Sequence, residues 1–453
     1  MNTRHTLALI LALLPAALLV HAQSYKPAFE KITLSNGMDV VFHRDTTLPA
    51  VSIHIAFRAG SCWDPSGLRG IATVSGNLLL ASLPAHAASE LGKIQTEATA
   101  AYASLTSVDW TNITLTYPSK YLDAGLWIES ERLKAVGDAV TEVMLKQTVE
   151  YMIAQRRETA KDPSADMQEA LYREMYPEGH PYAHLSTGDT TELRKITLAE
   201  VRKFMKLFHT AGNASMTISG DFRIDDAKKL VRKYFAGLPA SKRFVWKTEA
   251  RKFDPAGPVA MIKQAPVDFS TLQIVFPTVP LGDPDEAALQ LLAKLLAGAG
   301  DARLKKLYLD NNPNVLDVTA RQTSQDLHGM FTITITCRAE TQLRSVFEQA
   351  LTLLQTIPRT PVSEDEMSMS RSLNEMEFLL PMESVHGFGG RGDALNLGNL
   401  YTSNPASQFA GIEAQSRVTP FALREAARRY LSGASVVVLS IVPPGRQELG
   451  VTL

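Results

Sequence analysis

The two halves of the chain repeat one order of predicted elements: strand, helix, strand, long helices and a closing strand. Strands are predicted where apolar and polar residues alternate, and helices where apolar residues recur every three or four positions. The first-half strands are predicted at Glu30–His43 (a hairpin that turns at Asn36-Gly37), Ala50–Arg58, Thr111–Tyr117 and Ala214–Ser219. The first-half helices are predicted at Gly70–Ser82, Lys120–Lys134, most of Thr148–Phe208, and Asp225–Phe235.

The second half begins near Met261 and follows the same order. Its strands are predicted at Thr271–Phe276, Met330–Arg338 and Ser435–Val442, and its helices at Glu286–Leu296, Leu343–Gln355 and Pro420–Leu431. A repeated half of this kind predicts an α+β fold of two homologous lobes, each a mostly antiparallel sheet packed with helices. We place the lobes at residues 23–240 and 259–453, with an inter-lobe linker at 241–258. An ordinary surface loop is the alternative for that stretch.

The first 22 residues are typical of a secretory signal peptide. Arg4 precedes an apolar run from Leu7 to Val20, and Ala22 is a small residue suited to cleavage. The run is shorter than the roughly 20 apolar residues that a membrane anchor needs. No later segment predicts a membrane span, so we expect an exported protein, periplasmic or secreted.

Charge and cysteine content narrow the possible partners and cross-links. The formal net charge is −1, and nucleic acid is therefore not an expected partner, because phosphate binding needs a basic excess. Cys62 and Cys337 fall at the ends of predicted strands in different halves. We expect no disulfide between them, although export would permit one.

Segments spread along the chain resemble, in their order and spacing, the pitrilysin/insulinase (inverzincin) family of metallopeptidases, which includes the mitochondrial processing peptidases. The resemblance covers nearly all of the mature chain and implies two lobes arranged as a clamshell. It rests on Leu34-Ser35-Asn36-Gly37, Phe57-Arg58-Ala59-Gly60-Ser61, Gly70-Ile71-Ala72, Thr106–Asn112, Leu126–Arg132, Tyr176–Tyr182 and Gly392–Asn396.

The family's activity is that of a zinc-dependent endopeptidase, built on a His-x-x-Glu-His helix. The two histidines bind zinc, the glutamate acts as general base, and a glutamate from a later helix completes the coordination. The resemblance puts Thr73, Gly76 and Asn77 at the three helix positions and Gln155 at the later one. A hydroxyl, two amides and a missing side chain are poor substitutes for imidazole and carboxylate. We therefore expect no catalytic residue and no metal here, with zinc only in a catalytic partner.

Three other histidine-containing segments could suggest a site. His180 and His184 have the spacing of a ligand pair, but Pro181 disfavours a continuous helix through them, so a structural role is predicted. His86 is expected in an exposed loop. His386–Gly392 is glycine-rich, but a helix break is predicted there and not a phosphate loop, which needs a preceding strand.

The resemblance also indicates where a peptide would bind. In the family, an edge strand near residues 98–107 pairs with extended substrate, so the candidate binding residues are Ala103, Ser104, Thr106 and Ser107. A purely structural strand is the alternative. In the second lobe, Ala302-Arg303-Leu304 resembles the segment before a substrate-anchoring arginine and tyrosine. Those two positions fall near Leu309 and Leu316, so the pair is expected to be absent.

Three functions remain open on these grounds. The first is a non-catalytic homologue that pairs with a zinc-bearing relative and helps to enclose peptide or unfolded polypeptide. The second is an active zinc metalloendopeptidase with an atypical site, which is disfavoured because no three-ligand set is visible. The third is a stand-alone peptide-binding scaffold.

Overall fold

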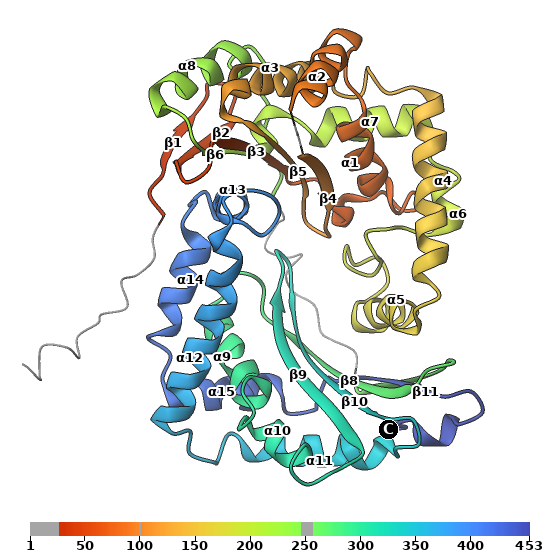
Figure 1. Ribbon diagram of the computed structural model, residues 1–453. Helices are drawn as coiled ribbons and strands as arrows, with labels where there is room; N and C mark the ends of the chain where they lie inside the picture. Colours follow the sequence, from red (N-terminus) through yellow and green to blue (C-terminus); the bar gives the residue numbers. More distant parts are fainter. Residues whose placement is uncertain (1–26, 99–100, 246–256) are drawn as a thin grey trace, which may run out of the picture.

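The computed structural model describes residues 27–98, 101–245 and 257–453, which form two lobes around one sheet each (Figure 1). Sheet A has six strands in the order β1-β2-β6-β3-β5-β4, and sheet B has five in the order β7-β11-β8-β10-β9. Neighbouring strands are antiparallel except for the parallel pairs β2–β6 and β7–β11. The predicted α+β fold of two lobes is confirmed. The predicted signal peptide lies outside the described residues.

The first lobe contains sheet A and the first eight α-helices. Its strands are β1 (Glu30–Thr33), β2 (Asp39–Arg44), β3 (Ala50–Phe57), β4 (Ala101–Thr106), β5 (Thr111–Pro118) and β6 (Ala214–Gly220). Its helices are α1 (Ile71–Ala81), α2 (Ala85–Glu97), α3 (Leu122–Lys134), α4 (Glu142–Thr159), α5 (Pro163–Met175), α6 (Thr190–Leu193), α7 (Leu198–Phe208) and α8 (Ile224–Phe235).

The second lobe contains sheet B and the remaining helices. Its strands are β7 (Val259–Gln264), β8 (Phe269–Thr278), β9 (Val315–Ser324), β10 (Gly329–Arg338) and β11 (Val437–Val442). Its helices are α9 (Glu286–Ala297), α10 (Arg303–Tyr308), α11 (Leu343–Thr356), α12 (Glu364–Leu379), α13 (Arg391–Thr402), α14 (Ser407–Gln415) and α15 (Pro420–Tyr430).

Local sequence signals explain where several elements start and turn. The first hairpin turns at Gly37, whose φ of 92° suits glycine, and the Asn36 side chain donates to the Phe235 carbonyl at 2.8 Å. Capping boxes begin two helices: Thr197 pairs with Glu200 at α7, and Ser363 pairs with Glu366 at α12. These caps satisfy backbone amides that a helix start leaves without intrahelical partners.

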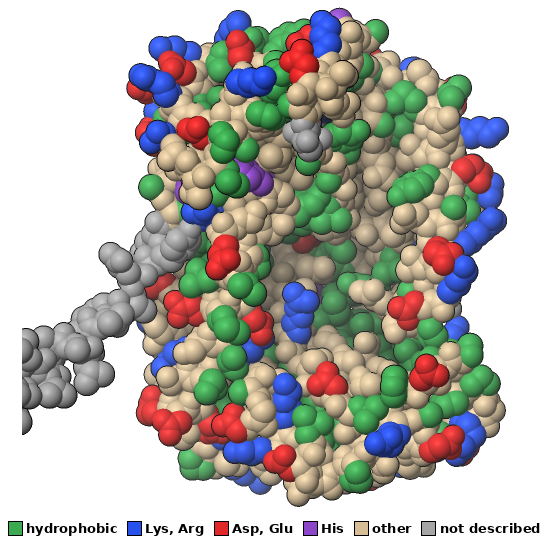
Figure 2. All heavy atoms as spheres, in the orientation of Figure 1, with side chains coloured by type: hydrophobic (Ala, Val, Ile, Leu, Met, Phe, Trp, Pro, Cys, Tyr) green, Lys and Arg blue, Asp and Glu red, His purple; other side chains and the backbone are tan. Residues whose placement is uncertain are grey.

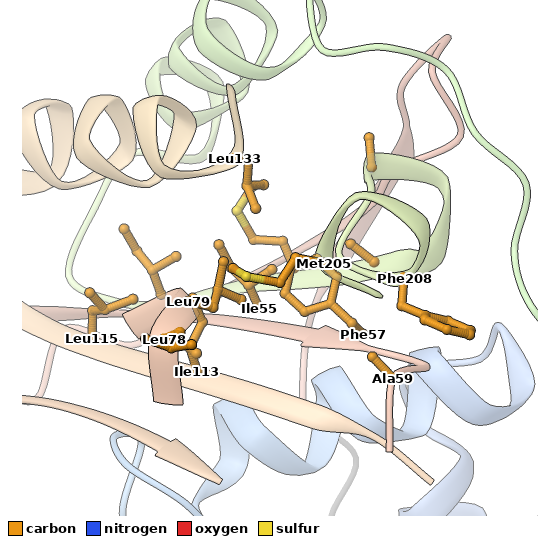
Figure 3. Packing of buried hydrophobic residues seen from close by; sticks show 14 of the residues in the cluster. Ile55, Phe57, Ala59, Leu78, Leu79, Ile113, Leu115, Leu133, Met205 and Phe208 are labelled. Carbon is orange, nitrogen blue, oxygen red and sulfur yellow. The ribbon is translucent and has the colours of Figure 1, made fainter. Parts of the chain in front are cut away.

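Each sheet buries one face against helices of its own lobe. In sheet A, alternate residues of β3 (Ile55 and Phe57) point into a core that includes Leu78 and Leu79 of α1 and Met205 of α7 (Figure 3). In sheet B, the equivalent core is lined by alternate residues of β10, among them Phe331, Ile333 and Ile335. Because side chains alternate across a strand, the intervening residues point to the opposite face, toward the other lobe.

The two lobes exchange helices across these opposite faces. Helix α13 of the second lobe packs on β6 and β3 of sheet A, and α5 of the first lobe packs on β11 and β7 of sheet B (Figure 1). The α13 contact is polar: Asn399 donates to Ser215 Oγ at 2.9 Å, and Asn112 donates to Asp393 Oδ1 at 2.5 Å. The α5 contact is apolar and places Met175 in one cluster with Leu439. The exchange makes each lobe part of the other's packing.

Some sequence-based expectations need correction. His86 lies in helix α2 and not in a loop, although its side chain is exposed as expected and pairs with Glu131. Strand β9 was not predicted, because its outward side chains are polar and its alternation is weak. A helix break lies at this glycine-rich segment as predicted: α12 ends at Leu379, and α13 begins at Arg391, so Arg391 and Gly392 are already helical. Cys62 and Cys337 are both buried, and neither is part of a disulfide. Residues 246–256 of the predicted linker lie outside the described residues.

Across residues 27–98, 101–245 and 257–453, no single helix combines the length and the hydrophobicity needed to cross a membrane. Helices α1 and α2 reach that threshold only as a pair bent by 70°. Helix α1 is a core helix, with Val74, Leu78 and Leu79 fully buried.

Candidate functional site

The candidate site is centred on helix α1, which is clamped at both ends by buried charged groups. At its start, Asp64 Oδ2 accepts from Gly70 N at 2.6 Å and Oδ1 accepts from Ala72 N at 3.0 Å. Burial raises the pKa of Asp64, and these bonds together with His184 at 3.4 Å partly offset that rise. A carboxylate at this end also complements the helix dipole. The start of the helix is therefore held in a defined position.

A buried ion pair holds the other end of α1. Arg132 of α3 donates to the carbonyls of Leu79 and Leu80 at 2.7 and 2.6 Å, which the end of the helix leaves without intrahelical donors. The same guanidinium pairs with Glu129 at 2.9 Å, and both side chains are almost wholly buried. Buried side chains thus hold both ends of α1 in place, independently of the residues at the predicted ligand positions.

Thr73, at the first predicted ligand position, is engaged by a loop. Its Oγ1 donates to the carbonyl of Ser186 at 2.5 Å. Gly188 in this loop and Gly70 just before α1 allow the two segments to approach closely. A Cβ built at Gly188 would lie only 2.3 Å from the Arg69 carbonyl oxygen. The hydroxyl that replaces an imidazole therefore anchors the loop, and a larger side chain would have to displace it.

Gly76, at the position of the general base, is closed by the neighbouring strands. A Cβ built at Gly76 would lie 2.5 Å from Thr106 Oγ1 and 2.9 Å from Thr111 Cγ2. Real Cβ atoms do not approach other atoms this closely, so any side chain at position 76 requires Thr106 and Thr111 to shift. Ser104 Oγ also donates to the Gly76 carbonyl at 3.1 Å. The predicted position of the general base thus has no side chain, and threonine side chains fill the space beside it.

The other two predicted positions carry amides. Asn77 is half-buried on α1, and Gln155 is exposed on α4, which packs against α1. The Gln155 amide donates to Tyr151 Oη at 2.7 Å on the same helix. In the part of the chain that the structure describes, no three His, Cys, Asp or Glu side chains are grouped so that they could hold a metal. A zinc ion that the fold family would imply does not fit the residues present.

The histidines weighed as a replacement pair serve other contacts. His180 stacks on Tyr176 with ring centroids 4.6 Å apart, and its Nδ1 accepts from Tyr182 N at 3.1 Å. Burial lowers the pKa of His180 to about 4. His184 Nε2 lies 3.1 Å from the Ser61 carbonyl oxygen and faces Asp64. Both lie in a loop, as Pro181 predicted.

The candidate peptide-binding residues lie on and beside β4, the outermost strand of sheet A among the described residues. Ala103 is half-buried on this strand, while Ser104 and Thr106 direct their hydroxyls toward α1 and β5. Ser107 is a turn residue whose Oγ accepts from the amides of Asp109 and Trp110, both at 3.2 Å. Beside them, Tyr102 and Leu105 expose about half of their surface. A peptide could therefore meet the strand's backbone and these two side chains.

The second-lobe segment that resembles an anchoring site is used for packing. Arg303 forms a two-pronged pair with Glu366 of α12, at 2.7 and 2.9 Å, and also donates to the Pro361 carbonyl. Leu309 and Leu316 are exposed apolar residues. The segment carries no arginine and tyrosine at the two expected positions, as the sequence indicated.

A polar face of sheet B was missed by the sequence reasoning. The half of the sheet that α5 leaves uncovered presents polar side chains, most of them hydroxyls, and Figure 2 shows the molecular surface hollowed between the two lobes. We call this face the polar floor; its residues are Thr271, Gln273, Asp317, Thr319, Arg321, Thr332, Thr334 and Thr336. The alternation Thr-Ile-Thr-Ile-Thr in β10 was the available signal for it.

Comparison with known proteins agrees with this architecture. Residues 195–374 match the family described as "Peptidase M16 inactive domain". A curated relative, "Zinc protease PqqE" of Helicobacter pylori (strain ATCC 700392 / 26695), is 21% identical over 377 residues, which is 82% of this chain and 84% of the relative.

Solved structures give the same result for the fold. A protease from Helicobacter pylori superposes with a TM-score of 0.80 at 19% identity, covering 92% of this chain and all of that one. A peptidase M16 inactive domain from Pseudomonas fluorescens gives 0.78 at 19% identity, covering 93% and 99%. A chain of complex III2 from Candida albicans gives 0.76 at 15% identity, covering 92% and 96%.

Proposed function

Because this chain belongs to the peptidase M16 family and the helix that would carry the zinc motif lacks it, we propose that it is a non-catalytic partner subunit. It pairs with a zinc-bearing relative and helps to enclose peptide or unfolded polypeptide. The single observation that carries the proposal is the closure of position 76 by Thr106 and Thr111. Restoring the zinc motif would require new side chains at positions 73, 76, 77 and 155, and at position 76 the new side chain would also have to displace Thr106 and Thr111.

The residue types at the predicted zinc-ligand positions support the same proposal. Zinc proteases of this type need two imidazoles and a carboxylate on the metal and a second carboxylate to take a proton from bound water. Thr73 and Asn77 offer a hydroxyl and an amide, and Gln155 offers another amide. None of these binds zinc as imidazole or carboxylate does. No hydrolytic step can be derived through this helix.

The polar floor and the edge strand support a role in holding polypeptide. Strand β4 has a free edge among the described residues, and a peptide can add to such an edge by backbone hydrogen bonds. The polar floor adds hydroxyl and amide groups, which can bond to peptide groups without selecting a side-chain sequence, and the two charged side chains of Asp317 and Arg321. A chamber lined in this way favours extended, hydrophilic chain segments.

The place of action in this proposal is outside the cytoplasm. The apolar run from Leu7 to Val20 supports export, followed by removal of residues 1–22. The partner would be exported with it and is expected to carry a signal of this type.

Co-expression with a zinc-bearing relative encoded nearby tests the proposal. Copurification of the two chains, with peptide cleavage only when the zinc-bearing chain is present, is the expected result. A native size of one chain in the presence of that relative, together with peptide binding, would favour a stand-alone scaffold instead. Tightly held zinc in this chain alone, lost on Gln155→Ala, would favour an atypical active enzyme.

A further inference from the structure

The two lobes meet at a buried polar cluster that neither the missing zinc motif nor the peptide-binding proposal uses. Five side chains, which we call the junction cluster, come together there from separate segments. They are Arg58 after β3, Asp109 in the β4–β5 turn, Tyr182 in the loop after α5, Asp326 in the β9–β10 turn and Tyr401 on α13.

Most of the bonds in the junction cluster cross from one lobe to the other. Arg58 of the first lobe pairs with Asp326 of the second at 2.7 Å and donates to the Tyr401 carbonyl at 2.8 Å. In the reverse direction, the amide of Asp326 donates to Asp109 at 3.0 Å, and the amide of Leu327 donates to Tyr182 Oη at 2.9 Å. The cluster therefore has to break when the lobes separate.

The cluster holds two carboxylates but directs its guanidinium to one of them. Arg58 pairs with Asp326. Asp109 accepts from neutral donors: Tyr182 Oη at 2.5 Å, Tyr401 Oη at 3.1 Å and the Asp326 amide. A buried carboxylate without a cationic hydrogen-bond donor is costly to keep ionised, and the charge of Asp326 nearby adds repulsion.

We propose that the junction cluster is a proton-controlled clasp, in which uptake of one proton by Asp109 strengthens the hold between the lobes and its release loosens that hold. The step is a simple proton transfer between solvent and a carboxylate oxygen. It needs no other reactant. The inference concerns this chain alone and does not depend on a catalytic partner.

The direction of the effect follows from the pKa. Burial, above all, together with the charge of Asp326, raises the pKa of Asp109 from 3.8 to about 6 against the lowering effect of its hydrogen bonds. A separated, hydrated Asp109 would return toward 3.8. The closed form therefore binds the proton more tightly, and closure is favoured as the pH falls from about 6 toward 4. Above that window Asp109 is ionised in both forms, and the advantage is lost.

The neighbouring groups with a shifted pKa stay mainly in one protonation state between pH 5 and pH 7.5. Burial first, and the charge of Asp109 among later causes, raises the pKa of Tyr172 and Tyr176 on the α5 side. Burial lowers the pKa of His180 to about 4 and that of His328 to about 3, so both are mainly neutral above pH 5. Burial also raises the pKa of Tyr182 and Tyr401. The thiol of the buried Cys62 is a further ionisable group near Tyr182.

Hydrogen exchange of the Asp326 and Leu327 amides measures the clasp directly, because both donate across the junction. On the full chain, after correction for intrinsic rates, the opening constant is expected to be about tenfold smaller at pH 5.0 than at pH 7.5, given a pKa of about 6 closed and 3.8 open. Asp109→Asn, which mimics the neutral form, should remove this pH dependence. Asp310→Asn, at an exposed position of the second lobe, is the matched control and should retain it.

A second variant keeps the test decisive if Asp109→Asn does not fold. Asp326→Asn removes the repelling charge, so the midpoint of the pH effect should move to lower pH. Equal opening constants at the two pH values in the unmodified chain, or a tenfold change that persists in Asp109→Asn, would overturn the proposal.

Discussion

At the scale of single residues, the evidence is strongest where a side chain is missing. Gly76 leaves no room for a Cβ, whereas Gly92 on the neighbouring helix α2 has nothing within 4 Å of the position where its Cβ would be. Both are helical glycines, so they differ mainly in the space around them. This pair separates the cost of filling position 76 from the general effect of replacing a glycine.

Gly76→Glu should destabilise the protein by about 1–3 kcal/mol, because Thr106 and Thr111 must move to admit the side chain. Gly92→Glu should be neutral or stabilising, since glycine in a helix interior costs about 0.5–1 kcal/mol relative to alanine and glutamate is also a good helix former. Urea unfolding of the two variants measures the difference. A Gly76→Glu protein as stable as the Gly92→Glu protein would show that position 76 is open.

The threonine that fills the site can be tested by coupling. Thr106→Ala removes the hydroxyl at 2.5 Å, so the double variant Gly76→Glu/Thr106→Ala should be less destabilised than the sum of the two single changes. Additive free energies of unfolding would contradict direct contact between the two positions.

At the scale of elements, helix α1 keeps its supports although it has lost its ligands. Arg132→Met should cost about 3–5 kcal/mol, since it leaves Glu129 charged and unpaired in the interior and the last carbonyls of α1 without donors. The control is Lys134→Met on the same helix, where an exposed pair with Glu131 is worth about 1 kcal/mol or less. Equal losses in unfolding free energy would mean that the buried pair does not support α1.

The elements could be predicted wherever a local pattern decided them. The alternation in β10 and the apolar spacing in α9 and α15 gave the right type over nearly the right range. The loop predicted at His86 is wrong because Pro84 stands just before the helix as its N-cap, and the alanines that follow it are strong helix formers. Strand β9 was missed because its pairing partner β10, and not its own composition, makes it a strand.

At the scale of the whole molecule, the exchange of α5 and α13 links the two lobes. Met175 of α5 is 2% exposed against sheet B, so Met175→Ala should cost about 2–5 kcal/mol. Met369→Ala on the outer face of α12, where the side chain is 47% exposed, should change stability by less than about 0.5 kcal/mol. Thermal unfolding of both variants tests whether the inter-lobe contact is part of the core.

The candidate site was predictable only in part, for a physical reason. The absence of ligands at Thr73, Gly76, Asn77 and Gln155 can be read directly from the residue types. The filling of position 76 depends on a threonine 30 positions along the chain, and the junction cluster joins Arg58 to Asp326. Contacts between residues so far apart depend on the sheet register and on which helix crosses to which lobe, and no local pattern contains that information.

The central claim is that this polypeptide cannot activate water on a metal. The most direct test is peptide hydrolysis by the purified chain alone, with zinc content measured after dialysis. The account predicts no tightly held zinc and no hydrolysis above the blank, with or without added metal. Hydrolysis that a chelator abolishes and zinc restores would contradict it.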